Sequence, residues 1–329
     1  MNYTGIGIIS TVVLLSIVLI VVITVTILKS KNKIKKPFFI PKSTTKIHLW
    51  HGEEDAKLEF MYSPVILSIK EVIKTIYPHV EINYKSDYYE WEDIKPTDTL
   101  IWVGWINKPD FNSLKDKNIY TVYYNTEPFI ENVSSDEIWT YSRYLFNLHS
   151  QEYKQGNQII RYIPILCEKN VPSVPYLFKE SPMNLIFMGA FYLRKDKISI
   201  LKEYPLIKDN LLEVFNLWND RDFTTFVSSK PHIYLNVTKT NNVVLPSFRL
   251  NKLLSHRCII ISNHTNPLDE LDYKDLIIFC DLRDMESEYK KLLELSNEEL
   301  HQKSNQIYKK FYSRFTLKNA MKRVLQKTI

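Results

Sequence analysis

From residue 46 onward, short apolar runs of strand length alternate with segments of helical periodicity. No other feature of the chain limits the possible folds as strongly. The runs are rich in Ile, Val, Trp and Tyr, and several are continuously apolar, as in strands covered on both faces. We predict strands at residues 46–50, 80–84, 99–105, 119–125, 137–141 and 159–165, and a helix at 63–77. Strand, helix and strand in this order are typical of a parallel sheet with helices packed on it.

A second alternation follows a proline-containing stretch, residues 171–182, which we predict to be a linker between domains. We predict strands at 184–188, 233–237, 258–262 and 276–280, and helices at 195–204, 220–228, 246–255 and 285–295. Asp284 is expected to cap the last of these, and Ser296 with Glu299 forms a capping-box signature for a further helix. The predicted fold is α/β, with two Rossmann-like, doubly wound domains (46–170 and 183–295) that face a cleft. Helices in residues 296–329 are expected to pack back on the core.

The N-terminal segment predicts one transmembrane helix that precedes these domains. Residues 1–28 carry no charged side chain, and five lysines follow within residues 29–36 of a basic linker (29–45). About 20 apolar residues cross a bilayer as a helix, and flanking lysines stay on the cytoplasmic side. We therefore expect a single-pass membrane protein with its N-terminus outside or lumenal and its globular domains in the cytosol. Asn-x-Ser/Thr triplets at Asn132, Asn236 and Asn263 would instead favour a lumenal domain.

Charge and composition exclude several other classes. Without the lysines of residues 29–36, the net charge of +6 falls to +1, and no basic stripe with interleaved aromatics argues for a nucleic-acid partner. Three widely spaced cysteines indicate neither a disulfide framework nor a zinc site. Walker and Gly-x-Gly-x-x-Gly patterns are absent, as are His/Cys clusters. We therefore expect no metal site and no cofactor.

Two candidate catalytic residues follow predicted strands of the first half, where such sheets bind ligands. Glu127 comes directly after the strand at 119–125, although Glu127 and Pro128 could simply begin a turn. His51 follows the first strand, and a neutral imidazole there could take a proton from a hydroxyl group. The acidic residues 53–55 could orient His51 and raise its pKa, but an isolated histidine near a turn is more often only exposed.

Candidate anion-binding residues follow strands of the second half. Gly189 would let the backbone approach a ligand closely, and Arg194 could meet a phosphate. Ser247 marks a helix N-terminus that favours anions, with Arg249 and Lys252 three positions apart on one face. A solvated helix would carry similar charges, so an ordinary surface helix stays open as the alternative.

The order of these segments resembles the GT-B glycosyltransferases, in particular glycosyltransferases of the capsule- and spore-protein type from bacteria and large DNA viruses. The matching segments lie between residues 100 and 282, and each is short. They are Tyr124 to Glu127, Ile138 to Ser142, Tyr162 to Pro164, Ile186 to Gly189, Tyr234 to Asn236, Phe248 to Leu254 and Cys258 to Ser262. One departure is visible, because the glutamate that usually opens the closing helix falls here at Pro246 or Ser247.

The resemblance implies transfer of a sugar from a nucleotide-sugar donor to a hydroxyl of a glycan, protein or lipid acceptor, without a bound metal. The N-terminal domain would bind the acceptor, and the C-terminal domain would bind the donor. Arg194 and Arg249 would neutralise the leaving diphosphate, and His51 or Glu127 would act as the base. Two alternatives remain: a non-catalytic, membrane-tethered binding protein with the same fold, and an unrelated α/β enzyme such as an oxidoreductase.

Overall fold

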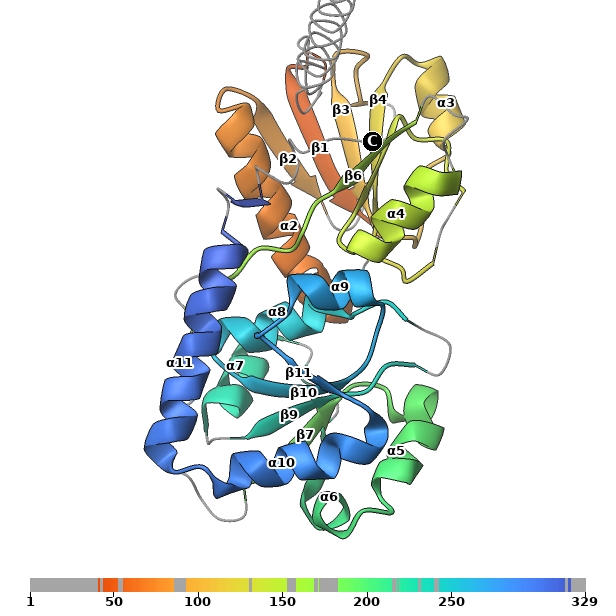
Figure 1. The fold of residues 1–329 in the computed structure, drawn as a ribbon. Helices are drawn as coiled ribbons and strands as arrows, with labels where there is room; N and C mark the ends of the chain where they lie inside the picture. Colours follow the sequence, from red (N-terminus) through yellow and green to blue (C-terminus); the bar gives the residue numbers. More distant parts are fainter. Residues whose placement is uncertain are drawn as a thin grey trace, which may run out of the picture.

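The computed structural model describes residues 41, 44–52, 56–85, 93–129, 132–152, 158–168, 171, 183–214, 217, 219–229, 232–239, 243–316 and 319–320. The predicted transmembrane segment (1–28) lies outside the described residues, as do most of the basic linker and most of the linker at 171–182. None of the helices that the structure describes has both the length and the apolar composition needed to cross a bilayer. The described chain forms two α/β domains (Figure 1).

The N-terminal domain contains, in its described part, a six-stranded sheet of order β2-β1-β3-β4-β5-β6, and every neighbouring pair is parallel. Its elements are β1 (Lys46–His51), α2 (Ala56–Ile76), β2 (Glu81–Lys85), β3 (Thr99–Val103), α3 (Phe111–Asp116), β4 (Tyr120–Asn125), β5 (Glu137–Thr140), α4 (Arg143–Glu152) and β6 (Ile159–Tyr162). These strands confirm the six predicted from the apolar runs. The predicted helix at 63–77 is also present, but it begins earlier, at Ala56.

Both faces of the central part of this sheet are buried, which explains why several of its strands are continuously apolar. On one face, Ile69 of α2 is fully buried in a cluster with Ile47 and Leu49 of β1. On the other face, Trp102 of β3 is fully buried in a cluster with Phe111 of α3. Each such side chain stabilises the fold by about 1.5–3 kcal/mol relative to its exposed state.

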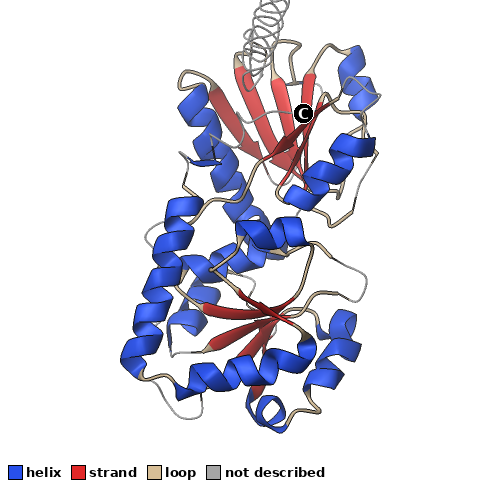
Figure 2. Cartoon of the chain, viewed as in Figure 1, coloured by secondary structure: helices blue, strands red, loops and turns tan. Residues whose placement is uncertain are grey.

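The C-terminal domain contains a second parallel sheet, of order β11-β10-β9-β7-β8, and helices flank both sheets (Figure 2). Its elements are β7 (Leu185–Met188), the 3-10 helix η2 (Phe191–Arg194), α5 (Lys195–Leu201), α6 (Pro205–Asn210), β8 (Leu211–Val214), α7 (Asp220–Ser229), β9 (Ile233–Asn236), α8 (Ser247–Ser255), β10 (Ile259–Asn263), α9 (Pro267–Asp272) and β11 (Ile278–Cys280). The sequence prediction missed β8, an edge strand that is only partly buried, and the short helices α6 and α9.

Further helices close the described chain: η3 (Leu282–Asp284), α10 (Met285–Glu294) and α11 (Asn297–Arg314). The predicted capping box is confirmed, because the Ser296 hydroxyl accepts from the N–H of Glu299 and the Glu299 carboxylate accepts from the N–H of Ser296. The predicted Asp284 cap is wrong: its side chain makes no capping hydrogen bond, and its backbone is already helical at the end of η3.

The carboxyl edges of the two sheets meet around α8, which lies between the domains (Figure 1). Tyr141, directly after β5, packs edge-on against Phe248 of α8 with ring centroids 4.6 Å apart. Tyr62, in the N-terminal part of α2, lies 6.3 Å from the same ring. The strand-end loops of both domains therefore surround one helix, as expected for ligand sites in open α/β sheets.

Candidate functional site

Arg249 of α8 bridges the carboxyl ends of two strands. Its Nη1 donates to the carbonyl oxygen of Met188, the last residue of β7, at 2.6 Å. Its Nη2 donates to Oδ1 of Asn236, the last residue of β9, at 2.5 Å. Gly189 follows Met188 with a φ of +147°, and a Cβ atom at that position would lie 2.6 Å from Nη1 of Arg249. The structure therefore brings the predicted residues Gly189 and Arg249 together, and the glycine makes room for the guanidinium.

Arg194 joins this pair from the end of η2. Only 7% of its surface is exposed, and its Nε donates to the carbonyl oxygen of Val237 at 2.6 Å. Burial lowers the pKa of Arg249 to about 9, with a further contribution from the nearby charge of Arg194. Burial also lowers the pKa of Arg194. Both guanidiniums are thus held in place by uncharged groups in a setting that disfavours their charge.

Lys197 of α5 is a third cation at this edge, and sequence reasoning did not single it out. Its Nζ donates to the hydroxyl of Thr238 at 2.9 Å, and burial together with the charge of Arg194 lowers its pKa. Among the described residues, no carboxylate pairs with Arg194, Lys197 or Arg249. Three positive charges without a counter-charge favour the binding of an anion, and guanidinium groups match phosphate in particular.

Hydrogen bonds of two asparagine side chains, Asn236 and Asn263, fix the residues that hold this cation group. Nδ2 of Asn236 donates to the Ser262 hydroxyl at 2.8 Å. Oδ1 of Asn263 accepts from the N–H of Thr238 at 2.8 Å, and Nδ2 of Asn263 donates to the Thr238 hydroxyl at 2.9 Å. Both asparagines are buried, at 1% and 8% exposed. An asparagine that ends an apolar strand was the available signal, and it placed Asn236 in a segment of the resemblance, whereas Asn263 was considered only as part of a glycosylation triplet.

Ser247 and Lys252 lie on α8 but do not join the arginines. Ser247 is 4% exposed, and its buried hydroxyl has no hydrogen-bond partner among the described residues. Lys252 is also 4% exposed, and its Nζ lies 3.8 Å from a carboxylate oxygen of Glu168. The structure therefore places Lys252 next to the segment that leaves the first domain. Lys252 and Arg249 were predicted to lie on one face of the helix, but their cationic groups contact different partners and do not form one binding site.

His51 ends β1 at the expected edge, but it is fully buried. Its Nε2 lies 2.8 Å from the Tyr84 hydroxyl, and its Nδ1 has no hydrogen-bond partner among the described residues. Burial, with the charge of Lys70, lowers its pKa to about 4. The expectation of a raised pKa is therefore wrong, and the acidic residues 53–55 lie outside the described residues. His51 is neutral at pH 7, but it is a weak base without solvent contact.

Glu127 lies in a tight turn after β4 and is only partly buried. Its N–H donates to Oδ1 of Asn125 at 2.8 Å, while Nδ2 of Asn125 donates to the carbonyl oxygen of Phe129 at 2.8 Å. This side-chain turn fixes the loop that presents the carboxylate. Tyr62 lies between the two candidate bases: its ring is 5.9 Å from that of His51, and its hydroxyl is 3.4 Å from that of Thr126. Glu127 is the more accessible of the two bases.

Helix α9 holds the two domains together. The carboxylate of Asp269 accepts from the Ser142 hydroxyl at 2.9 Å, from the N–H of Tyr144 at 3.2 Å and from the N–H of Leu245 at 3.3 Å. The carboxylate of Asp272 accepts two hydrogen bonds from Arg143, at 3.0 and 2.5 Å. Asp269 and Asp272 are 4% and 5% exposed. The carboxylate of Asp269 lies at the N-terminus of α4, where free N–H groups and the helix dipole stabilise an anion. Helix α9 therefore connects the two domains, and we refer to it as the clasp.

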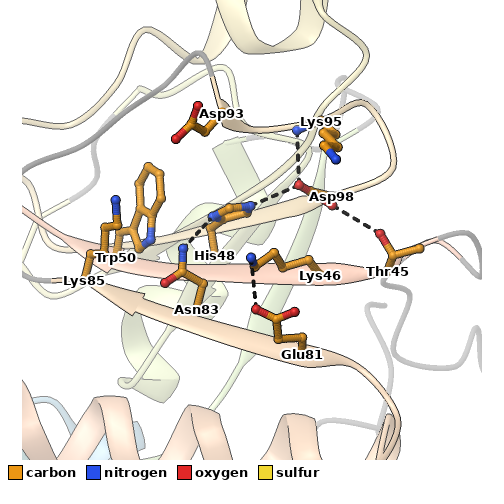
Figure 3. Close-up of a pocket in the computed structure, with 10 residues that line it drawn as sticks. All are labelled: Thr45, Lys46, His48, Trp50, Glu81, Asn83, Lys85, Asp93, Lys95 and Asp98. Atoms are coloured by element: carbon orange, nitrogen blue, oxygen red, sulfur yellow. Dashed lines mark hydrogen bonds and ion pairs between the residues drawn. The ribbon is translucent and has the colours of Figure 1, made fainter.

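A polar cavity of about 320 Å³ lies away from this edge, over β1 and β2 (Figure 3). Its centre is the buried pair of His48 and Asp98, with Nε2 and Oδ2 3.1 Å apart. Nδ1 of His48 lies 3.4 Å from Nδ2 of Asn83, so both ring nitrogens have neighbours. Burial lowers the pKa of His48. The pair is a satisfied structural contact and does not border the strand ends described above.

Within the described residues, no group of three His, Cys, Asp or Glu side chains could hold a metal ion. The cysteines Cys167, Cys258 and Cys280 are free and buried. Burial raises the pKa of the Cys258 thiol well above its usual value, and it also raises that of Cys280, to about 12. The thiols of Cys258 and Cys280 are therefore not nucleophiles at neutral pH.

Comparisons with known proteins support the fold. No family model matches the chain, and no curated protein matches it. Its fold is similar to a solved structure described as trehalose-6-phosphate from E. coli bound with UDP-2-fluoro glucose, with a TM-score of 0.52, 7% identity, 86% of this chain covered and 99% of that one. Other similar structures are an alpha1,3-fucosyltransferase (TM-score 0.47, 12% identity, 88% and 93% covered) and the lipopolysaccharide outer core galactosyltransferase WaaB (0.45, 11%, 84% and 97%).

At these identities the likeness shows the fold alone. The structure bound with UDP-2-fluoro glucose supports the two-domain, GT-B-like fold that the sequence resemblance predicted. The two parallel sheets and their facing carboxyl edges are the features that define this class of protein.

Proposed function

We propose that this protein is a glycosyltransferase that moves a sugar from a nucleotide-sugar to an acceptor hydroxyl. The observation that carries the proposal is the group of cations formed by Arg194, Lys197 and Arg249, which has no carboxylate partner among the described residues and lies across the domain boundary from Glu127. The fold, similar to that of a protein bound to UDP-2-fluoro glucose, supports a sugar-nucleotide ligand.

In the proposed reaction, the acceptor oxygen attacks the anomeric carbon while the bond from that carbon to the diphosphate oxygen breaks. The nucleoside diphosphate leaves with the bonding electron pair, and its growing charge is stabilised by Arg194 and Arg249. These cations accelerate the reaction to the extent that they bind the transition state more tightly than the donor. We propose that they do this without a metal ion or other cofactor. If the anomeric configuration inverts, Glu127 takes the acceptor's proton, because it is more accessible than His51.

The proposal includes a membrane anchor in residues 1–28, with the lysines of residues 29–36 on the cytosolic side. The lipid bilayer would then be a permanent partner, and both domains would lie in the cytosol. Glycosylation offers a test of this topology. Asn236 and Asn263 are buried, whereas Asn132 is exposed. A glycan at Asn132 in expressing cells, detected by a glycosidase-sensitive mobility shift, would place the domains in the lumen.

The donor is tested by thermal shift of the full-length chain against UDP-, GDP-, ADP- and CDP-sugars in the presence of EDTA. A ligand at 100 times its Kd stabilises a folded protein by about 2.7 kcal/mol. We expect one nucleotide class to bind and Arg249→Ala to abolish both the shift and sugar transfer. Arg283→Ala is the matched control, because that arginine is exposed in the same domain and, among the described residues, pairs with the surface carboxylates of Asp281 and Asp284. Transfer by Arg249→Ala at the wild-type rate would contradict the assignment.

A further inference from the structure

Two large aromatic side chains are exposed at the carboxyl edge of the first sheet. Trp105, two residues after β3, is 48% exposed, and Phe129, four residues after β4, is 49% exposed. By contrast, the other tryptophans that the structure describes, Trp50, Trp102 and Trp139, are at most 1% exposed. An exposed tryptophan in an otherwise buried set is a feature that binding surfaces share.

Hydrogen bonds hold both loops in one conformation. The N–H of Gly104, which has a φ of +90°, donates to the carbonyl oxygen of Tyr124 at 3.1 Å. Nδ2 of Asn107 donates to the carbonyl oxygen of Gly52 at 3.1 Å, which ties the loop after β3 to the end of β1. The turn of Asn125 fixes Phe129, as described above. Rigid aromatic side chains lose little conformational entropy when they bind a ligand.

The two loops lie side by side and share this edge with the candidate base. Val103 of β3 pairs with Tyr124 of β4, so the residues that follow these strands leave the sheet as neighbours. Glu127 lies between Asn125 and Phe129 in the second loop. The edge therefore presents flat apolar rings next to a partly exposed carboxylate.

We propose that Trp105 and Phe129 form the acceptor subsite and that the acceptor is a glycan. A sugar ring combines an apolar C–H face, which packs on an aromatic ring, with hydroxyl groups that donate to a carboxylate. A lipid chain would instead need continuous apolar surface, whereas the exposed Asn107 and the carboxylate of Glu127 interrupt it here. The assignment of this subsite as the acceptor site rests on the proposed function, but glycan binding at the two rings can be measured without catalysis.

The test uses the full-length chain in lauryldimethylamine oxide, whose headgroup is not a sugar. Cellotetraose, chitotetraose, mannotetraose and galactotetraose are titrated by calorimetry against wild type, Trp105→Ala, Trp105→Phe and Phe129→Ala. Tyr312→Ala is the matched control, because Tyr312 is 42% exposed on α11, away from this edge. Nucleotide binding by each variant is measured in parallel by thermal shift.

We expect at least one tetrasaccharide to bind the wild type, with Kd at least 10-fold higher in Trp105→Ala and Phe129→Ala. Trp105→Phe and Tyr312→Ala should stay within about 3-fold of wild type, and nucleotide binding should not change in any variant. Failure of all four tetrasaccharides to bind the wild type would overturn the proposal, as would wild-type affinity in both alanine variants. If a glycan binds through Trp105 but no nucleotide-sugar binds, the transferase assignment fails and the glycan site stands.

Discussion

Replacing Gly189 with alanine should damage the donor side of the site through Arg249. A Cβ atom would lie 2.6 Å from Nη1 of Arg249, and the φ of +147° is one that residues other than glycine rarely adopt. The backbone strain costs about 1–3 kcal/mol. Nη1 of Arg249 must also move away from the carbonyl oxygen of Met188, and a lost hydrogen bond to a charged group costs about 1.5–3 kcal/mol. We therefore expect Gly189→Ala to lower the unfolding free energy by about 2.5–6 kcal/mol in urea denaturation.

The same displacement should weaken the binding of a nucleoside diphosphate about 10- to 100-fold, because one charge-assisted contact to the phosphates is misplaced. Gly104→Ala is the matched control. Its φ of +90° gives comparable strain, but its Cβ atom would approach Tyr62 in the other domain, 3.0 Å from the hydroxyl oxygen. It should lose similar stability and keep its nucleotide affinity. If calorimetry below the melting temperature shows wild-type affinity for Gly189→Ala, the geometry of Arg249 does not matter for the donor.

Two other predictions concern the interior. Asp269→Asn replaces one of the two carboxylate oxygens that accept from Ser142, Tyr144 and Leu245 with an NH2 group, which cannot accept, so we expect the domains to unfold in two calorimetric transitions where the wild type shows one. A single transition at an unchanged temperature would contradict the role of α9 as a clasp. Burial lowers the pKa of His51 to about 4, so the unfolded chain binds the proton more tightly and stability is lost as the pH falls from about 6.5 toward 4. The loss reaches about 3 kcal/mol, and the slope of unfolding free energy against pH should be shallower in His51→Gln; equal slopes would show that the histidine is not buried in solution.

The sequence predicts the sheets well because a strand that is buried on both faces appears in the sequence as a run of apolar residues. All strands of the first sheet correspond to apolar runs, and Trp50 and Trp102 are inside because each faces a second layer of structure. The strand β8 was missed for the opposite reason. It lies at the edge of its sheet, where Leu212 is 42% exposed, so its pattern is not that of a buried strand. Edge position depends on the tertiary fold and is absent from local periodicity.

The candidate site was predicted only in part. Gly189 directly follows β7 and lies beside Arg249, whereas spacing predicted that Arg249 would share a helix face with Lys252, and Lys197 joins the arginines because its Nζ donates to Thr238. Lys252 shows the limit of such spacing. Two residues three positions apart share a face of a helix, but a long side chain can extend toward the nearest opposite charge. The Lys252 side chain extends toward Glu168. The burial of His51 was equally invisible, since it depends on Tyr84 of a neighbouring strand.

The clasp links the placement of the donor cations to the acceptor side. Asp269 binds the N–H of Leu245, just before α8 begins, and the same carboxylate binds Ser142 at the start of α4. Arg249 is the third residue of α8. A movement of α4 relative to α9 therefore shifts the residues that precede the helix carrying the arginine. Tyr141, next to Ser142, packs on Phe248, next to Arg249. The domains therefore cannot separate without breaking both this ring contact and the hydrogen bonds of Asp269. The placement of Glu127 relative to the cations therefore depends on packing between the domains, in which Asp269 takes part.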